Sequence, residues 1–147
     1  MGVRERLVEV AVPENARRCA LSRCALALLY PSRFEGFGWP IIEAQACGCP
    51  VLCADREPMS EVGGEAAITH DVDDEAGFAR AILQLTDPAE RARWSARSLA
   101  NVQRFAAEDM TAQYIALYRR LGVAAGRCPE SPLGFVPAFP PPPLLHR

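Results

Sequence analysis

The sequence of 147 residues contains no CxxC pair and only two histidines, His70 and His146. Structural zinc sites combine several Cys and His ligands at short spacings, so no metal site is expected here. The cysteines are interpreted as small apolar thiols in a reducing cytosol, in preference to a redox or metal-binding role. The six cysteines are Cys19, Cys24, Cys47, Cys49, Cys53 and Cys128.

Long apolar runs and basic stripes are also lacking. No apolar run approaches the roughly 20 residues that span a bilayer, so no transmembrane segment is expected. No signal peptide precedes the first charges at residues 4–6, which predicts a cytoplasmic protein, peripheral at a membrane only through regions outside this sequence. The formal net charge is −2 and the pI is about 5.7, so nucleic acid is not an expected partner.

Half of the residues are apolar and 23% are charged, which is ordinary for a globular protein with a single modest core. Residues 1–122 are predicted to form one domain. Residues 123–147 are rich in proline and are predicted to be a disordered tail. The run from Pro140 to Pro143 could alternatively serve as a polyproline ligand for a partner domain.

Apolar segments of strand length alternate with amphipathic helical patterns, which is typical of an α/β fold with a doubly wound sheet. Strands are predicted at residues 7–12, 25–30, 51–54 and 66–69. Helices are predicted at residues 14–23, 40–47, 58–63, 74–85, 88–105 and 108–121. The expected architecture is a partial Rossmann-like parallel sheet of about four strands flanked by helices.

For three of these segments the sequence also predicts which faces are buried. The run Ala25–Tyr30 is continuously apolar, which predicts a strand covered on both faces of the sheet. Spacings of three and four residues predict one apolar face on each of the last two helices. The faces consist of Ala92, Ala96, Leu99 and Val102 in the first, and of Met110, Tyr114, Leu117 and Leu121 in the second.

The most informative stretch is EGFGWPIIE, at residues 35–43. A strand precedes it, its two glycines permit a tight turn, and Pro40 suits the first turn of a helix. Such a helix N-terminus receives phosphate groups, because unpaired amides and the positive end of the helix dipole face the ligand. The amides of Trp39, Ile41 and Ile42 are predicted to bind a diphosphate without any lysine.

Acids stand at both ends of this stretch. Glu43 lies about one turn into the helix, where a carboxylate can accept hydrogen bonds from a ribose diol. Glu35 follows a strand, at the edge where open α/β sheets bind ligands, and could hold a sugar hydroxyl or the charge developing on a sugar ring. A nucleotide-sugar meets both requirements. A nicotinamide dinucleotide fingerprint is disfavoured, because Ile41 occupies the third glycine position.

The segment at residues 30–67, YPSRFEGFGWPIIEAQACGCPVLCADREPMSEVGGEAA, closely resembles the C-terminal, donor-binding domain of group 1 (family 4) glycosyltransferases. The hallmark of that family is a pair of glutamates separated by seven residues, here Glu35 and Glu43. A looser similarity extends over residues 14–121. The resemblance implies the GT-B fold, in which two Rossmann-like domains face each other across a cleft.

The resemblance also implies a retaining glycosyltransferase that uses UDP-, GDP- or ADP-sugars as donor substrates and needs neither a cofactor nor a metal. By the same resemblance, Glu35 is the expected catalytic residue in contact with the donor sugar, and Glu43 binds the ribose. Backbone between the two acids contacts the sugar and the phosphates. The implied donor-binding residues are Gly36, Phe37, Gly38, Trp39, Ile41, Ile42 and Glu43.

Compared with that family, the sequence lacks the first strands of the donor domain, a recognisable Arg/Lys phosphate clamp and the acceptor domain. Three interpretations follow. The protein could be an enzyme that acts with a partner chain carrying the missing N-terminal domain. It could be a truncated, non-catalytic remnant that still binds nucleotide-sugars. It could also be an interaction module that uses its proline-rich tail.

Overall fold

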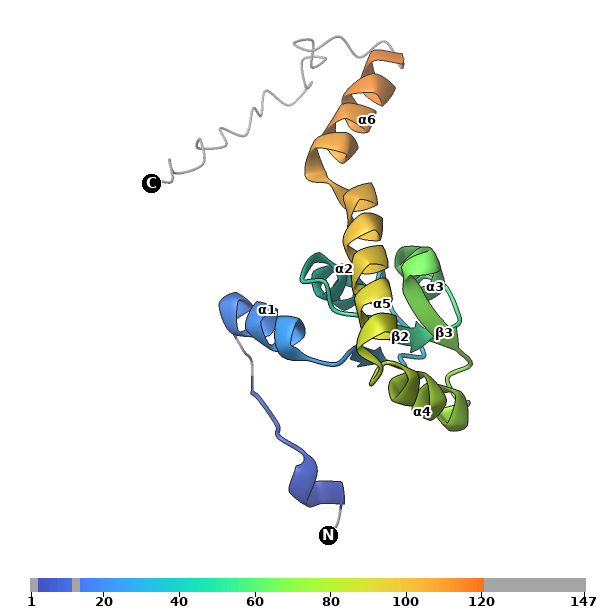
Figure 1. The fold of residues 1–147 in the computed structure, drawn as a ribbon. Helices are drawn as coiled ribbons and strands as arrows, with labels where there is room; N and C mark the ends of the chain where they lie inside the picture. Colours follow the sequence, from blue (N-terminus) through green and yellow to red (C-terminus); the bar gives the residue numbers. More distant parts are fainter. Residues whose placement is uncertain (1–2, 12–13, 121–147) are drawn as a thin grey trace. The chain divides into compact units, whose positions relative to one another are not determined.

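The computed structural model describes residues 3–11 and 14–120 (Figure 1). The chain divides into two units, the first ending at Ala106 and the second beginning at Ala107. The predicted tail at residues 123–147 lies outside the described residues. In the part of the chain that the structure covers, no helix is long and apolar enough to cross a membrane.

The first unit contains a parallel sheet of three strands in the order β1-β2-β3. The strands are β1 (Leu28–Tyr30), β2 (Val51–Ala54) and β3 (Ala67–His70). In the register of the sheet, Val51 is paired with Leu28 on one side and Ala67 on the other. The predicted fold class, an α/β protein with a parallel sheet, is confirmed.

The predicted strand at residues 7–12 is wrong over its described part. Residues 7–11 have no regular structure, and they follow a short 3-10 helix η1 (Val3–Arg6). Leu7 is 71% exposed and Val8 is 86% exposed. An apolar run becomes a strand only when a neighbouring strand pairs with it and a core covers it, and the described residues provide neither for this segment.

Helices connect and cover the strands. In the first unit they are α1 (Asn15–Cys24), α2 (Trp39–Ala46), α3 (Met59–Gly63), α4 (Glu75–Gln84) and α5 (Pro88–Asn101), with the 3-10 turns η2 (Gly64–Ala66) and η3 (Val102–Phe105). Local signals fix several ends. The Asp74 carboxylate accepts a hydrogen bond from the Gly77 amide at 2.8 Å and caps α4. Gly48 follows α2 at φ +70°, the left-handed region that favours glycine at a helix C-terminus.

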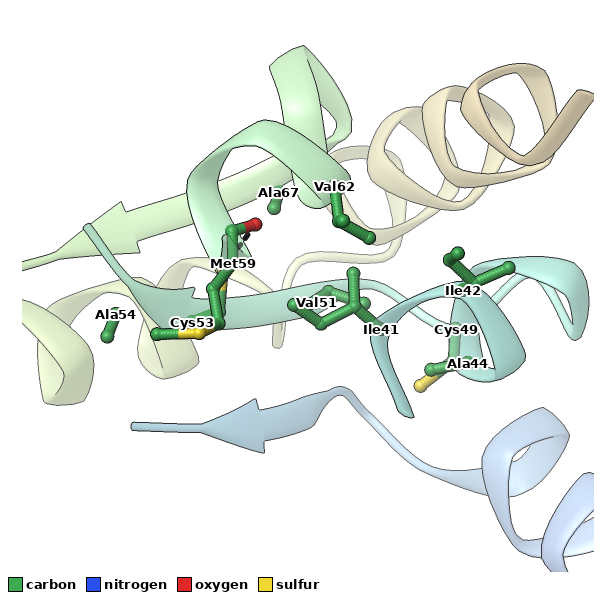
Figure 2. Packing of buried hydrophobic residues seen from close by; sticks show 10 residues of the cluster. All are labelled: Ile41, Ile42, Ala44, Cys49, Val51, Cys53, Ala54, Met59, Val62 and Ala67. Carbon is green, nitrogen blue, oxygen red and sulfur yellow. Dashed lines mark hydrogen bonds between the residues drawn. The ribbon is translucent and has the colours of Figure 1, made fainter. Parts of the chain in front are cut away.

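Strand β2 is the centre of the core, and all four of its residues are buried. Val51 and Cys53 belong to a cluster with residues of α2 and α3, including Ile41 and Met59 (Figure 2). Leu52, which points to the other face of the sheet, packs in a second cluster with residues of α4. The sheet is therefore covered on both faces at β2.

At β1 the prediction of burial on both faces is wrong. Leu29 in the middle of this strand is 48% exposed. The residue is as apolar as its neighbours, but β1 is an edge strand, since it pairs only with β2 within the described residues. A continuous apolar run indicates strand structure, whereas its burial depends on which elements lie beside it.

Helix α5 presents a different face to the core from the predicted apolar one. Leu99 is 47% exposed, whereas Ser98 is fully buried. The Ser98 hydroxyl donates to the Cys49 carbonyl at 3.2 Å. The side-chain amide of Asn101 donates to the Gln45 side chain at 2.8 Å and to the Val62 carbonyl at 3.0 Å. Polar partners in α2 and α3 thus determine the orientation of α5.

The second unit contains α6 (Ala107–Arg120), which buries none of its residues. Its predicted apolar face is present in the sequence, but Met110, Tyr114 and Leu117 are 55%, 53% and 44% exposed. Leu121, the fourth predicted member, lies outside the described residues.

Candidate functional site

All three strands run in parallel, so their carboxyl ends meet at one edge of the sheet. The loop after β1 carries Glu35 and leads into α2. The loops after β2 and β3 border a cavity of about 340 Å³ at the same edge. It is lined by Arg33, Ala54, Asp55, Arg56, Asp71, Val72 and Asp73. Ligands of open α/β sheets bind at this edge, where the loops are free to carry functional groups.

The two glycines of the turn have different structural roles. Gly38 is buried, adopts φ +99° and immediately precedes α2. A Cβ atom there would lie 3.4 Å from Cδ1 of Ile41 on a backbone that L side chains rarely adopt, so the position requires glycine. A Cβ atom on Gly36 would meet no atom within 4 Å. Gly38 shapes the turn, and Gly36 leaves space in front of it.

The amides at the start of α2 are only partly as predicted. Pro40 has no N–H, and the Ile41 amide donates to the Gly38 carbonyl at 3.0 Å. The prediction that the Ile41 amide is an unpaired donor is therefore wrong, because the tight turn pairs it internally. In the described residues, no backbone carbonyl accepts from the Trp39 amide outside the helical ladder. The side chains of Ile41 and Ile42 lie in the core, so only their backbone could reach a ligand.

Glu35 is exposed and lies near two hydroxyl groups. The neighbouring Tyr30 hydroxyl holds the pKa of the Glu35 carboxyl below its ordinary value, whereas the Ser32 hydroxyl donates to the Phe34 carbonyl at 3.3 Å. Burial and the neighbouring Glu35 raise the pKa of Tyr30 to about 12. At neutral pH the pair therefore consists of a carboxylate and a protonated phenol. The arrangement suits an anion that accepts hydrogen bonds or stabilises positive charge, and it disfavours a general acid.

Glu43 is paired with an arginine that the sequence analysis assigned to no role. The Nη1 atom of Arg18 in α1 lies 3.3 Å from Oε2 of Glu43, and both side chains are about half exposed, at 46% and 49%. A cavity of about 620 Å³ opens between α1 and α2, and both residues line it. Pro40 also lines this cavity, but Glu35 does not. The two acids of the motif therefore have separate surroundings in this structure.

Aromatic rings surround the glycine turn. The Phe37 ring lies 5.1 Å from the Trp39 ring and 6.2 Å from the Phe105 ring, measured between centroids. Trp39 is 64% exposed and Phe34 is 84% exposed. The Arg56 guanidinium lies over the Phe34 ring at 5.2 Å. Backbone contacts alone were predicted for Phe37 and Trp39. The proximity of the Phe37 ring to Phe105, which comes from a distant part of the chain, was not predicted.

Gln45 supports α2 from inside. Its side chain is fully buried, and its amide donates to the Gly63 carbonyl at 3.2 Å. The same side chain accepts the hydrogen bond from Asn101. This network links α2 to α3 and α5, and it fixes the helix whose opposite face carries Glu43. Among the described residues, no group of three or more His, Cys, Asp or Glu side chains could hold a metal ion.

Comparisons with known proteins place this architecture among sugar-transferring enzymes. The family described as glycosyl transferases group 1 matches residues 5–87, which include the whole Glu35–Glu43 motif. An O-antigen chain mannosyltransferase B of Escherichia coli is 40% identical over 102 residues, covering 69% of this chain and 27% of that protein. A D-inositol 3-phosphate glycosyltransferase of Acidothermus cellulolyticus is 30% identical over 121 residues, covering 81% of this chain and 27% of that protein.

A solved structure extends the likeness to the fold. Sucrose-phosphate synthase from Thermosynechococcus elongatus superposes with a TM-score of 0.72 at 28% sequence identity, covering 82% of this chain and 31% of that one. The chain thus spans about a quarter to a third of the length of the proteins compared with it.

Proposed function

We propose that this chain, which belongs to the group 1 glycosyl transferases, supplies the donor-binding part of a retaining glycosyltransferase. In this role it holds a nucleotide-sugar while the sugar passes to an acceptor. One observation carries the proposal. A single strand–turn–helix unit places an ionised Glu35 after β1, a glycine turn at the helix start and Glu43 on the exposed face of α2.

Glu35 is proposed to be the catalytic residue that contacts the donor sugar. The low pKa of its carboxyl keeps it anionic at neutral pH. An anion there can accept a hydrogen bond from a sugar hydroxyl and can stabilise the positive charge that develops on the ring as the nucleotide leaves. The protonated Tyr30 hydroxyl would hold the carboxylate in position while it does so.

The diphosphate is proposed to bind at the start of α2, against backbone of Gly36, Phe37, Gly38 and Trp39, with Ile42 contributing backbone only. The Ile41 amide is not one of these donors, because it is paired with the Gly38 carbonyl. Space in front of Gly36 and the positive end of the α2 dipole support this placement. Such donors would stabilise negative charge on the leaving phosphates, so we propose a reaction that needs no metal. The absence of lysine from the whole sequence leaves arginines and amides for this task.

Glu43 is proposed to accept hydrogen bonds from the ribose hydroxyls. In the structure its carboxylate is paired with Arg18 at 3.3 Å, at the border of the cavity between α1 and α2. An exposed ion pair of this kind is weak, so a ribose diol can share or displace it. The exposed position of Glu43 on a helix that the core holds firmly is what suits it to this task.

The identity of the donor sugar and the location of the acceptor site are further proposals. Two of the similar proteins are named as O-antigen chain mannosyltransferases, so mannose-bearing nucleotides are the first donors to test, with UDP, GDP and ADP as carriers. We place the acceptor site in a second domain, on a longer protein or on a partner chain, acting in the cytoplasm. Sugar transfer would then require that second domain as well as this chain.

The test is calorimetric titration of the 147-residue chain with UDP-, GDP- and ADP-sugars. We expect binding that prefers one base, and Glu43→Ala should weaken it about 10- to 100-fold, because a hydrogen bond to a charged group contributes about 1.5–3 kcal/mol. Glu35→Gln should retain most of this binding but lose transfer when a chain carrying the acceptor domain is added. Binding without transfer in that mixture would indicate a binding module in place of an enzyme.

Glu90→Ala is the matched control. Glu90 is also a helix carboxylate paired with an arginine, since it lies 2.8 Å from Arg93. Glu90 lies in α5 next to Arg91, whose side chain donates to the carbonyl of Ala25. Ala25 precedes β1, so Glu90 lies near the amino end of the sheet, opposite the proposed site. An equal loss of affinity in the two variants would contradict the role assigned to Glu43.

A further inference from the structure

Two thiols meet where α1 lies against α2. The sulfurs of Cys19 and Cys47 are 3.0 Å apart, although the two residues are separated by 28 positions in the chain. Cys19 lies in the middle of α1, and Cys47 is the C-cap residue that directly follows α2. Of the cysteines in the described residues, only these two have their sulfurs in contact with each other.

The contact between the two sulfurs is important for α1, because this helix buries little else against the rest of the first unit. None of its ten residues is buried, and all of them except Cys19 and Ser22 are exposed. Both line the cavity of about 620 Å³ between the two helices, together with Cys47. The thiol contact is thus among the few points at which α1 is protected from solvent by the rest of the first unit.

The same interface holds the ion pair of the proposed donor site. Arg18 precedes Cys19 directly, and Glu43 stands four residues before Cys47, one turn earlier on the same side of α2. The ion pair and the thiol pair therefore form two adjacent contacts between the same two helices. The thiol pair therefore lies next to the arginine that is paired with Glu43.

We propose that Cys19 and Cys47 are a reversible redox pair, which a low-molecular-weight disulfide oxidises to a bond that ties α1 to α2 beside Glu43. The sulfurs need to approach by only about 1 Å to reach the ~2.05 Å of a disulfide. The pair is reduced in a reducing cytosol and closes when oxidised small thiols accumulate. This proposal does not depend on the binding of a nucleotide-sugar.

The chemistry proceeds by two exchanges. The Cys19 sulfur attacks the small disulfide RSSR, which forms a mixed disulfide on Cys19 and releases one RSH. The Cys47 sulfur then attacks the Cys19 sulfur and releases the second RSH. Two protein thiols are oxidised, RSSR is reduced to two RSH, and the two thiol protons end on the released molecules. Burial and the neighbouring Cys19 raise the pKa of Cys47, which favours Cys19 as the thiol that attacks first.

The other cysteines are poor competitors for this reaction. Cys49 and Cys53 are buried in the core, at 2% and 0% exposure. Cys24, at the end of α1, is exposed and has no sulfur partner among the described residues. Cys128 lies outside the described residues, so the experiment uses the full chain with Cys128→Ser as its background.

The experiment treats this chain with glutathione disulfide, blocks the remaining thiols by alkylation and maps the peptides by mass spectrometry. We expect the loss of two thiols and the appearance of one linked pair of peptides, which contain Cys19 and Cys47. Dithiothreitol should restore both thiols. Scrambled linkages, or glutathione adducts that persist without a Cys19–Cys47 link, would overturn the proposal. This readout needs no variant at either cysteine.

Two matched variants then test which cysteines form the linkage. Cys47→Ser should abolish the linkage and leave Cys19 as a glutathione adduct, whereas Cys24→Ser on the same helix as Cys19 should leave the linkage intact. Trypsin cleavage after Arg17 and Arg23 should slow at least tenfold in the oxidised chain and recover on reduction, because the bond holds α1 in place. An unchanged cleavage rate in the linked chain would refute the tie between the helices.

Discussion

Helices α1 and α2 lie against each other, yet they are held in very different ways. Helix α2 buries four of its eight residues, Ile41, Ile42, Ala44 and Gln45. Helix α1 buries none of its ten. Their contact consists of an exposed ion pair, Arg18 with Glu43, and a thiol pair, Cys19 with Cys47. The motif is therefore anchored through α2, while α1 contributes contacts that can be made and broken.

This division suits a binding site. A helix fixed by the core keeps the glycine turn and Glu43 in one geometry, which reduces the entropy lost when a ligand binds. A helix attached mainly by polar groups can shift at small cost. If the interpretation is right, substitutions in α2 should act on the stability of the whole first unit, and those in α1 should act locally.

The largest expected effect is in the core. Ile41→Ala removes a fully buried side chain from the cluster around β2 and should lower the free energy of unfolding by about 2–5 kcal/mol. Leu21→Ala in α1, where the side chain is 49% exposed, should cost less than about 1 kcal/mol. Chemical denaturation followed by circular dichroism measures both. Similar losses in the two variants would remove the contrast between the helices.

A smaller effect is expected at the polar network behind α2. Gln45→Ala leaves the Gly63 carbonyl without its donor and removes the acceptor for Asn101, so we expect a loss of about 1–3 kcal/mol. Gln84→Ala, an exposed glutamine in α4, is the control and should change stability by about 0.5 kcal/mol or less. Urea unfolding of both variants tests this, and a neutral Gln45→Ala would show that apolar packing alone holds α2.

The smallest expected effect is at the ion pair between the helices. Arg18→Ala should lower the free energy of unfolding by about 1 kcal/mol or less, because both charges are half exposed and screened by water. Arg17→Ala, an exposed neighbour on the same helix, is the control. Thermal melts in low and high salt measure the difference, which should disappear as salt screens the pair. A loss of several kcal/mol would mean that α1 is anchored as firmly as α2.

Local sequence signals predicted most of the elements. Gly48 and Pro50 separated α2 from β2, and Val51–Ala54 was predicted with the bounds that the structure shows. Such signals act within a few residues, through glycine at positive φ, helix caps and apolar runs. The predicted strand at residues 7–12 failed because strand formation needs a partner strand, which a local pattern does not reveal.

The site was only partly predictable for the same reason. The Glu35–Glu43 motif and its glycine turn are contiguous, and their residues identified the family before any geometry was known. The pairing of Glu43 with Arg18 and the internal hydrogen bond of the Ile41 amide could not be inferred from spacing. Helix α5 shows the same limit, because its orientation follows from hydrogen bonds to distant carbonyls and not from its own apolar period.

The family, the α/β class and the two acids on which the proposed function rests could be identified from residue types at short spacings. Which apolar residues are buried, which arginine is paired with Glu43 and which cysteines meet became known only from the folded structure. Those properties depend on segments that are far apart in the chain and are brought together by packing around β2, so no local pattern encodes them.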